Sequence, residues 1–541
     1  MKLNQPSAMW LYGVLFAISL SCSKSTDEDI VHQSFLTFSD NSIPADKVAS
    51  NGGTFSVEVE WAFTRWSVKA GDVVDGGAFI SEILPAAGGN SDQDKSATTV
   101  SFRFVNNNSY GVNRQKIILK SLSQNLSDTI VVTQAGKPVP PIGIAIDPGT
   151  IYQTISGFGG ANAIWGNDNL TSGEMALAFG TGDDGLGLSI LRVRLSSVKS
   201  EWSALSATIR AANAFNVKVL ASPWSPPAAW KSNNNVNGGG YLLESHYADY
   251  AAYMNEFIQF MKDQGATVDV VSVQNEPDWK ASYEGCEYTA EQLFNFVKNH
   301  AGTIKGAKVL AAESLNFNQN YTNDILNDAV AANHISIVGG HLYGSGLANY
   351  PLALQKGKEL WMTEHLLNLD SGNKPENWTA STNPKAIWSE TMEMVQEIHS
   401  AMSLNWNAYI WWYIRRYYSF LGDGEKGTVR GQILKRGYAM SHYAKFIRPG
   451  YHRVAAQPTD DPLGLKITAY SGEGKTVLVI VNPTQAEIPE IQVTSQVNFS
   501  SAVAYTTSVS KNREKAMLSP ANNKVTLGLN ANSITTVVLG N

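Results

Sequence analysis

The hydrophobic and polar residues of this chain alternate with two different periods, which divide it into three folded parts. Between residues 34 and 136, short runs rich in β-branched residues alternate at every second position, and no helical pattern interrupts them. This pattern predicts a small all-β, immunoglobulin-like sandwich. The expected strands include residues 53–60, 98–106, 114–120 and 128–134.

Residues 137–143 are proline-rich and predict a stiff, extended linker. From residue 144 to residue 450, short apolar runs alternate with amphipathic helical segments. With a first strand near Gly157 this makes eight units, so we expect an α/β fold, a (β/α)8 TIM barrel. The expected helices are residues 201–216, 246–264, 290–305, 323–333 and 385–403. The expected strands are residues 188–194, 217–222, 268–274, 308–312, 335–342, 359–363 and 408–412.

The helical pattern ends near residue 450. Residues 451–541 alternate again and predict a C-terminal β-sandwich flanking the barrel, to which the first strand of the 144–450 segment contributes. The expected strands are residues 465–470, 476–481, 491–493, 502–507, 525–529 and 534–539.

The N-terminus has the features of an export signal. A lysine and a short apolar run lead to Cys22, so residues 1–21 are expected to be a lipoprotein signal peptide and residues 22–33 a polar tether. We expect Cys22 to be acylated and to hold the protein at the outer membrane, on the cell surface. An ordinary signal peptide cleaved nearby is the alternative.

Composition narrows the classes of partner. The 541 residues carry 41 basic and 47 acidic side chains, a formal charge of −6, which argues against nucleic-acid binding. The 14 Trp and 21 Tyr suit neutral, ring-shaped ligands such as sugars. Two cysteines provide no disulfide framework, and no HExxH or CxxC motif occurs. We expect a monomer that needs neither metal nor cofactor.

Two carboxylates stand at the ends of the fourth and seventh predicted barrel strands, where a barrel places its active site. Strands three steps apart face each other across the barrel mouth, so Glu276 and Glu364 can flank a glycosidic bond. We expect Glu276 to be the general acid/base and Glu364 the nucleophile. Tyr343, on the neighbouring strand, is expected to donate a hydrogen bond to Glu364 and to hold it ionised.

Several motifs resemble glycoside hydrolase family 30: Gln-Thr-Ile-Ser-Gly-Phe-Gly-Gly-Ala at 153–161, Ser-Pro-Trp-Ser-Pro-Pro at 222–227, Gln-Asn-Glu-Pro-Asp at 274–278 and Trp-Met-Thr-Glu-His at 361–365. Residues 409–418, 435–438 and 448–451 resemble its glucuronoxylanase subgroup, retaining enzymes that cut β-1,4-xylan beside a glucuronic acid branch. The resemblance implies the same roles for Glu276 and Glu364. It also implies Arg416 and Tyr418 as a clamp on the branch, and Trp224 and Trp412 as walls near the cleaved bond. Asn275 and Arg192, at strand ends, complete the expected substrate-binding set, together with Tyr343.

Some positions leave alternatives open. Arg415 and Arg416 should point to opposite sides, one bracing the barrel and one facing the ligand, and Trp411 and Trp412 should divide in the same way. After Glu364 the chain has Leu366 and Leu367, which cannot hydrogen-bond a glucuronate, although Asn368 or Ser371 could substitute. The N-terminal sandwich resembles the BACON domain, and its Trp61 and Trp66 are either core residues or a sugar platform. The rival functions are a β-glucanase or exo-xylosidase of the same family, and a non-catalytic surface glycan-binding lipoprotein.

Overall fold

The computed structural model describes residues 33–165, 169–367 and 382–540 of the protein. The predicted signal segment, Cys22, Asn368 and Ser371 lie outside these residues. The described residues form two compact units, one comprising residues 33–107 with Asn113–Ala135 and the other Asn108–Val112 with the described residues from Gly136 onward. Among the described residues, no helix is both long and apolar enough to cross a membrane.

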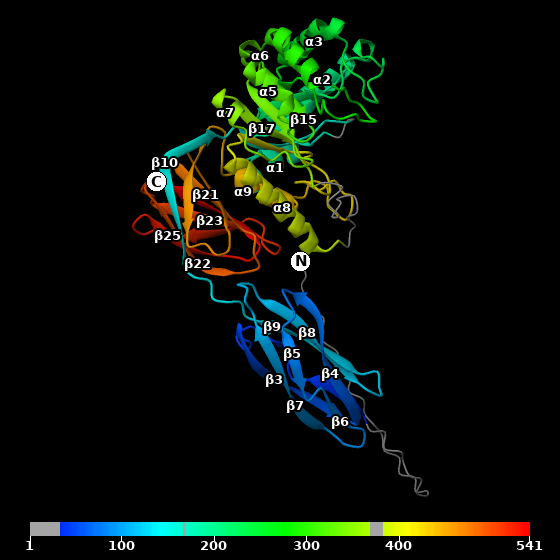
Figure 1. Cartoon of the computed structure of the whole chain (residues 1–541), viewed down its shortest axis with the longest axis vertical. Coiled ribbons are helices and arrows are strands. Elements are labelled where there is room, and N and C mark those ends of the chain that lie inside the picture. Colours follow the sequence, from blue (N-terminus) through cyan, green and yellow to red (C-terminus); the bar gives the residue numbers. More distant parts are fainter. Residues whose placement is uncertain (1–32, 166–168, 368–381, 541) are drawn as a thin grey trace, which may run out of the picture. The chain divides into compact units, whose positions relative to one another are not determined.

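The first unit consists of two β-sheets around one apolar core (Figure 1, blue). Trp61 and Trp66 are 4% and 0% exposed, so both belong to the core and the sugar-platform alternative is wrong. One sheet has the order β1 (Phe35–Phe38), β3 (Asn51–Ala62), β7 (Ser96–Asn106) and β5 (Ile80–Leu84). The other has the order β2 (Ser42–Ile43), β9 (Ser127–Gln134), β8 (Asn113–Ser121), β4 (Thr64–Asp75) and β6 (Ala87–Asn90).

The predicted barrel is confirmed: eight parallel strands close into a ring, with the last strand paired to the first. The barrel interior is filled by apolar side chains such as Ile190, Leu310 and Trp361, which are 0–1% exposed. Such a packed interior leaves the site to the loops at the strand ends. The strands are β11 (Gly157–Ala161), β12 (Ile190–Leu195), β13 (Lys218–Pro223), β14 (Val270–Ser272), β15 (Lys308–Ser314), β16 (Ile337–His341), β17 (Glu359–Glu364) and β18 (Ala408–Trp411).

Helices cover the outside of the barrel (Figure 1). The segment predicted as one helix over residues 323–333 is two, because Asp328 adopts an extended backbone and its side chain accepts hydrogen bonds from Val330 and Ala331, which starts a new helix. The helices are α1 (Ser172–Phe179), α2 (Trp202–Asn213), α3 (Tyr247–Asp263), α4 (Ala290–Asn299), α5 (Asn320–Asn327), α6 (Ala329–His334), α7 (Pro351–Gln355), α8 (Pro384–Ser403) and α9 (Lys435–Ala444).

Nine strands form the flanking β-domain, and they include β10 (Ile142–Thr154) from before the barrel. Side chains such as Ile144, Ile480 and Val537 share one apolar core, while Val477 and Val479 belong to the cluster that includes the barrel helices. The order is β24 (Glu514–Leu518), β23 (Ser501–Thr507), β26 (Ser533–Gly540), β21 (Lys475–Asn482), β20 (Lys466–Gly472), β19 (His452–Thr459), β10, β22 (Ile488–Ser495) and β25 (Lys524–Leu529).

Candidate active site

A cavity of about 410 Å³ opens at the C-terminal ends of the barrel strands. Its lining combines carboxylates with aromatic rings, the surface that a sugar with apolar C–H faces and polar edges requires. We call it the catalytic cavity. Its lining residues are Trp165, Trp224, Asn237, Glu276, Tyr283, Glu284, Glu364 and Trp412.

Glu276 follows strand β14 in an unusual backbone conformation. Its φ is +48°, in the left-handed region, and its N–H donates to the carbonyl of Glu313 at 2.9 Å. Glu313 itself has a φ of +59°. Strained backbone of this kind persists only where surrounding contacts over-determine it, and it concentrates at functional sites. The Glu276 side chain is 8% exposed and lines the catalytic cavity.

Glu364 ends strand β17 and receives two strong hydrogen bonds. The Tyr343 hydroxyl donates to its Oε1 at 2.7 Å, as expected from the sequence, and Arg192 Nη1 donates to its Oε2 at 2.6 Å. One carboxylate oxygen of Glu276 and one of Glu364 lie within 4.8 Å of each other. The two groups therefore meet across one small space.

Arg192 organises the floor of this site. Its guanidinium contacts Glu364, donates to Glu313 at 3.0 Å through Nε, and donates to Asn275 Oδ1 at 2.6 Å. Arg192 has no exposed surface and does not line the cavity. In the structure its guanidinium positions the carboxylates, and a part for it in substrate binding stays a prediction. Asn275 is also buried, at 3% exposed, and its amide oxygen accepts a hydrogen bond from Arg192.

The buried charges shift one another's pKa values. Burial alone would raise the pKa of Glu313, but Arg192 outweighs it and lowers that pKa to about 2. Burial alone would lower the pKa of His341, but the charge of Glu364 and the 3.0 Å hydrogen bond to Glu276 raise it to about 9. Burial raises the pKa of Glu364, against the opposing effects of His341 and Arg192.

Glu276, His341 and Glu364 each present one potential ligand atom, all within 4.8 Å of one another. The spacing would admit a metal ion, but the surrounding charge disfavours one. Arg192 and Tyr343 already donate to the two oxygens of Glu364, and His341 is bonded to Glu276. A cation would have to compete with a fixed, buried guanidinium.

Aromatic rings form the walls of the catalytic cavity. Trp224 lies 6.1 Å from Trp412 and 5.6 Å from Trp165, and Trp165 contacts Tyr283 edge to face. Trp165 and Tyr283 are 37% and 48% exposed, unusually open for such large rings. The expected division of Trp411 and Trp412 is present, because Trp411 is fully buried while Trp412 lines the cavity.

Arg415 and Arg416 also divide as expected. Arg415 is fully buried and bonded to Glu174 at 2.5 Å, whereas Arg416 is half-buried and its guanidinium lies 4.2 Å from the centre of the Tyr413 ring. Neither Arg416 nor Tyr418 lines the catalytic cavity. Tyr413 connects Arg416 to the catalytic cavity, because its ring centre lies 4.5 Å from that of Trp412, which lines the cavity.

Comparisons with known proteins agree with this geometry. The profile described as "Glycosyl hydrolase family 30 TIM-barrel domain" matches residues 192–412. Glucuronoxylanase XynC of Bacillus subtilis (strain 168) is 36% identical over 399 residues, which cover 72% of this chain and 89% of the relative. The chain belongs to glycosyl hydrolase family 30. It is therefore an enzyme, a glycoside hydrolase.

Two solved family 30 structures match most of the chain. A subfamily 8 xylanase from Clostridium acetobutylicum is 33% identical with a TM-score of 0.65, and an endoxylanase from Clostridium papyrosolvens C71 is 34% identical with a TM-score of 0.64. Each match covers 74% of this chain and all of the other. The predicted family is confirmed, and the BACON-like identity of the N-terminal unit stays a prediction.

Sequence reasoning missed several residues of this family 30 site. Glu313 lies near the end of the fifth strand, β15, within Ala-Ala-Glu-Ser, and a carboxylate at a strand end is the same signal that marks Glu276. Trp165, Tyr283 and Glu284 lie on loops, where periodicity gives no signal. Exposed aromatic residues in loops near strand ends would have been the available clue.

Proposed function

We propose that the protein is a retaining endo-β-1,4-xylanase that cleaves glucuronoxylan at positions set by (4-O-methyl)glucuronic acid branches. The observation that carries this proposal is the pair Glu276 and Glu364, which face one aromatic-walled cavity with oxygens within 4.8 Å of each other. Retaining enzymes hold their carboxyl groups about 5–5.5 Å apart, and inverting enzymes about 6.5–9.5 Å. The short separation supports retention.

The mechanism assigns one step to each carboxyl group. Glu364 attacks the anomeric carbon while protonated Glu276 gives its proton to the leaving oxygen, so the glycosidic bond breaks and a glycosyl–Glu364 ester forms. Glu276 then takes a proton from water, which displaces Glu364 with a second inversion. Arg192 and Tyr343 hold Glu364 so that its carboxylate faces the cavity.

The position of Arg416 supports a branch-reading role. Two rings in contact, Tyr413 and Trp412, lie between its guanidinium and the catalytic cavity. A cation separated from the cavity by two rings suits a carboxylate carried on a branch rather than the cleaved sugar. A guanidinium can bind such a carboxylate with two parallel hydrogen bonds. The name of the Bacillus subtilis relative supports the same substrate class.

The cellular setting is part of the proposal. Xylan is the expected partner and nucleic acid is not, given the net charge of −6. We propose that the enzyme acts as a monomer, anchored to the outer membrane through lipid on Cys22 and exposed at the cell surface.

Product analysis tests the proposal directly. Glucuronoxylan, unbranched xylan and arabinoxylan are incubated in parallel and the products are measured by mass spectrometry. We expect a ladder in which every oligosaccharide carries one glucuronate, with little product from the other two. Equal cutting of all three would remove the branch requirement, and no product from any would favour a β-glucanase or a glycan-binding protein.

The stereochemistry needs a separate measurement. Proton NMR during early hydrolysis should show β-configured reducing ends before mutarotation. Glu364→Ala should abolish hydrolysis while binding of glucuronoxylan persists. Early α-configured product would contradict retention.

A further inference from the structure

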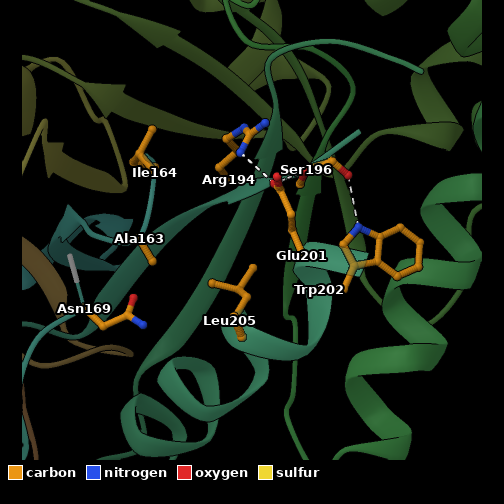
Figure 2. Close-up of a pocket in the computed structure, with 9 residues that line it drawn as sticks. Ala163, Ile164, Asn169, Arg194, Ser196, Glu201, Trp202 and Leu205 are labelled. Atoms are coloured by element: carbon orange, nitrogen blue, oxygen red, sulfur yellow. Dashed lines mark hydrogen bonds and ion pairs between the residues drawn. The ribbon is translucent and has the colours of Figure 1, made fainter. Parts of the chain in front are cut away.

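A second cavity, of about 200 Å³, lies at the end of strand β12 and the start of helix α2. We call it the side pocket. Figure 2 shows Glu201 between Arg194 and Ser196, with Asn169 and Leu205 opposite. Its lining residues are Ala163, Ile164, Asn169, Arg194, Ser196, Glu201, Trp202, Ala204 and Leu205.

Arg194 and Trp165 form the partition between the side pocket and the catalytic cavity. The Arg194 guanidinium lies 5.0 Å from the centre of the Trp165 ring and is paired with Glu284 at 2.5 Å. Trp165 and Glu284 line the catalytic cavity, whereas Arg194 lines the side pocket. The two cavities are therefore adjacent, and one substrate molecule can reach both.

The charges of the side pocket disfavour an acidic ligand. Arg194 is already bonded to two carboxylates, Glu284 at 2.5 Å and Glu201 at 3.2 Å. A further anion would meet this negative surplus at short range. The glucuronate branch is thus excluded from the side pocket on electrostatic grounds.

The remaining hydrogen-bonding capacity suits hydroxyl groups. Ser196 Oγ donates to Glu201 Oε2 at 2.6 Å, and Arg194 donates to the same oxygen. Glu201 Oε1 and the side-chain amide of Asn169 make no hydrogen bond with any other residue that the structure describes. Ala204 and Leu205 add apolar surface beside these polar groups. Carboxylate and amide groups next to a small apolar surface can bind the hydroxyls and C–H face of a sugar.

We propose that the side pocket is a second carbohydrate subsite, which binds an uncharged pentose unit of the same xylan molecule that occupies the catalytic cavity. This inference rests on the proposed function. The pentose is either a main-chain xylose beyond the cleaved pair or a neutral arabinose branch. The two sources share the same ring chemistry, and the test separates them.

Helix α2 offers a matched pair of variants. Ala204 and Ala207 are both exposed and lie one turn apart, but only Ala204 lines the side pocket. Ala204→Phe places a ring at the side pocket and leaves the residues of the Arg194 ion pairs unchanged, and Ala207→Phe places the same ring on the same helix outside the pocket. Equal melting temperatures for the two variants would establish that both fold.

Steady-state kinetics on glucuronoxylan with and without arabinose branches provides the test. We expect Ala204→Phe to raise KM about tenfold with little change in kcat, as loss of one to two hydrogen bonds would, and Ala207→Phe to behave as wild type. Loss on both substrates identifies a main-chain xylose, and loss only on the arabinose-branched one identifies the branch. Equal kinetics of the two variants on both substrates overturn the subsite.

The outcome stays separable from the proposed function. If the wild-type chain hydrolyses no xylan, the proposed function fails. Calorimetric titration of both variants with neutral arabinoxylan oligosaccharides then tests the side pocket alone, and equal affinity for Ala204→Phe and Ala207→Phe overturns it.

Discussion

The Nη1 atom of Arg192 lies 2.6 Å from Oε2 of Glu364, although Arg192 has no exposed surface. A fully buried guanidinium thus holds the proposed nucleophile, Glu364, whose carboxylate also lines the catalytic cavity. The same group is paired with Glu313 at 2.9 Å. One side chain therefore fixes two carboxylates, only one of which faces the catalytic cavity.

Replacement of Arg192 by lysine should cost both activity and stability. A single ammonium group cannot reach Glu364, Glu313 and Asn275 together, so at least one buried acceptor loses its partner. We expect kcat to fall by about 100-fold or more and the free energy of unfolding to fall by about 3–5 kcal/mol. The control is Arg210→Lys, on the exposed face of α2. Wild-type kcat in Arg192→Lys, measured on glucuronoxylan, would contradict this role.

His341 should make stability depend on alkaline pH. Its pKa is raised to about 9 in the folded protein, above the ordinary 6.5. A raised pKa stabilises the folded state fully below pH 6.5, and this contribution is lost as the pH rises through 9. The contribution of His341 to the free energy of unfolding that is lost over this range is on the order of 3 kcal/mol. Urea unfolding at pH 6, 7.5 and 9 measures it, and His341→Gln should flatten the profile. An equally steep decline in the variant would assign the effect elsewhere.

Glu313 should make the free energy of unfolding depend on acidic pH, in the opposite direction to His341. Its pKa is lowered to about 2, below the ordinary 4.5, so its contribution is complete above pH 4.5 and is lost as the pH falls through 2. Glu313→Gln should therefore weaken the dependence of the unfolding free energy on pH between 4.5 and 2, measured by urea titration. An unchanged slope would show that Glu313 is not responsible.

Alanine substitutions of the adjacent residues Trp411 and Trp412 should have different effects, one on stability and the other on substrate binding. Trp411 is fully buried, and Trp411→Ala should lower the free energy of unfolding by about 3–5 kcal/mol. Trp412 lines the catalytic cavity, and Trp412→Ala should leave a folded enzyme whose KM rises about tenfold or more. Thermal unfolding and initial rates on xylan separate the two effects. Equal destabilisation by both changes would mean that Trp412 is a packing residue.

The two neighbouring arginines allow a similar contrast. Arg416→Ala should reduce kcat/KM on glucuronoxylan about 10- to 100-fold, the value of one or two charged hydrogen bonds, and leave activity on unbranched xylan unchanged. Arg415→Ala should instead destabilise the fold, because it removes the buried guanidinium that pairs with the Glu174 carboxylate at 2.5 Å. An Arg416→Ala enzyme with wild-type preference for branched substrate would remove the proposed clamp.

The barrel and its two carboxylates were predictable because they follow from repeating patterns. The alternation of strands and helices predicts an eight-stranded barrel. A barrel places its active site at the C-terminal ends of its strands, which is where Glu276 and Glu364 lie. The contact between Arg192 and Glu313 was not predictable, since the two residues are 121 positions apart and no local pattern links them. The break at Asp328 was missed for another reason. The helical period continues through residues 323–333, and the N-cap hydrogen bonds outweigh it.

Strand β10 has a consequence for how this enzyme can be divided. It precedes the barrel in the chain, yet it pairs with β19 on one side and β22 on the other, so that Gly143 lies opposite Thr459, 316 positions later. Cutting the chain near residue 450 would therefore leave β10 with two unpaired edges and no sheet to enter. Recombination that exchanges barrels or flanking sheets between relatives must carry residues 142–154 with the C-terminal strands. The barrel and its flanking sheet should thus be inherited together, and we expect further domains to be gained or lost outside residues 142–541.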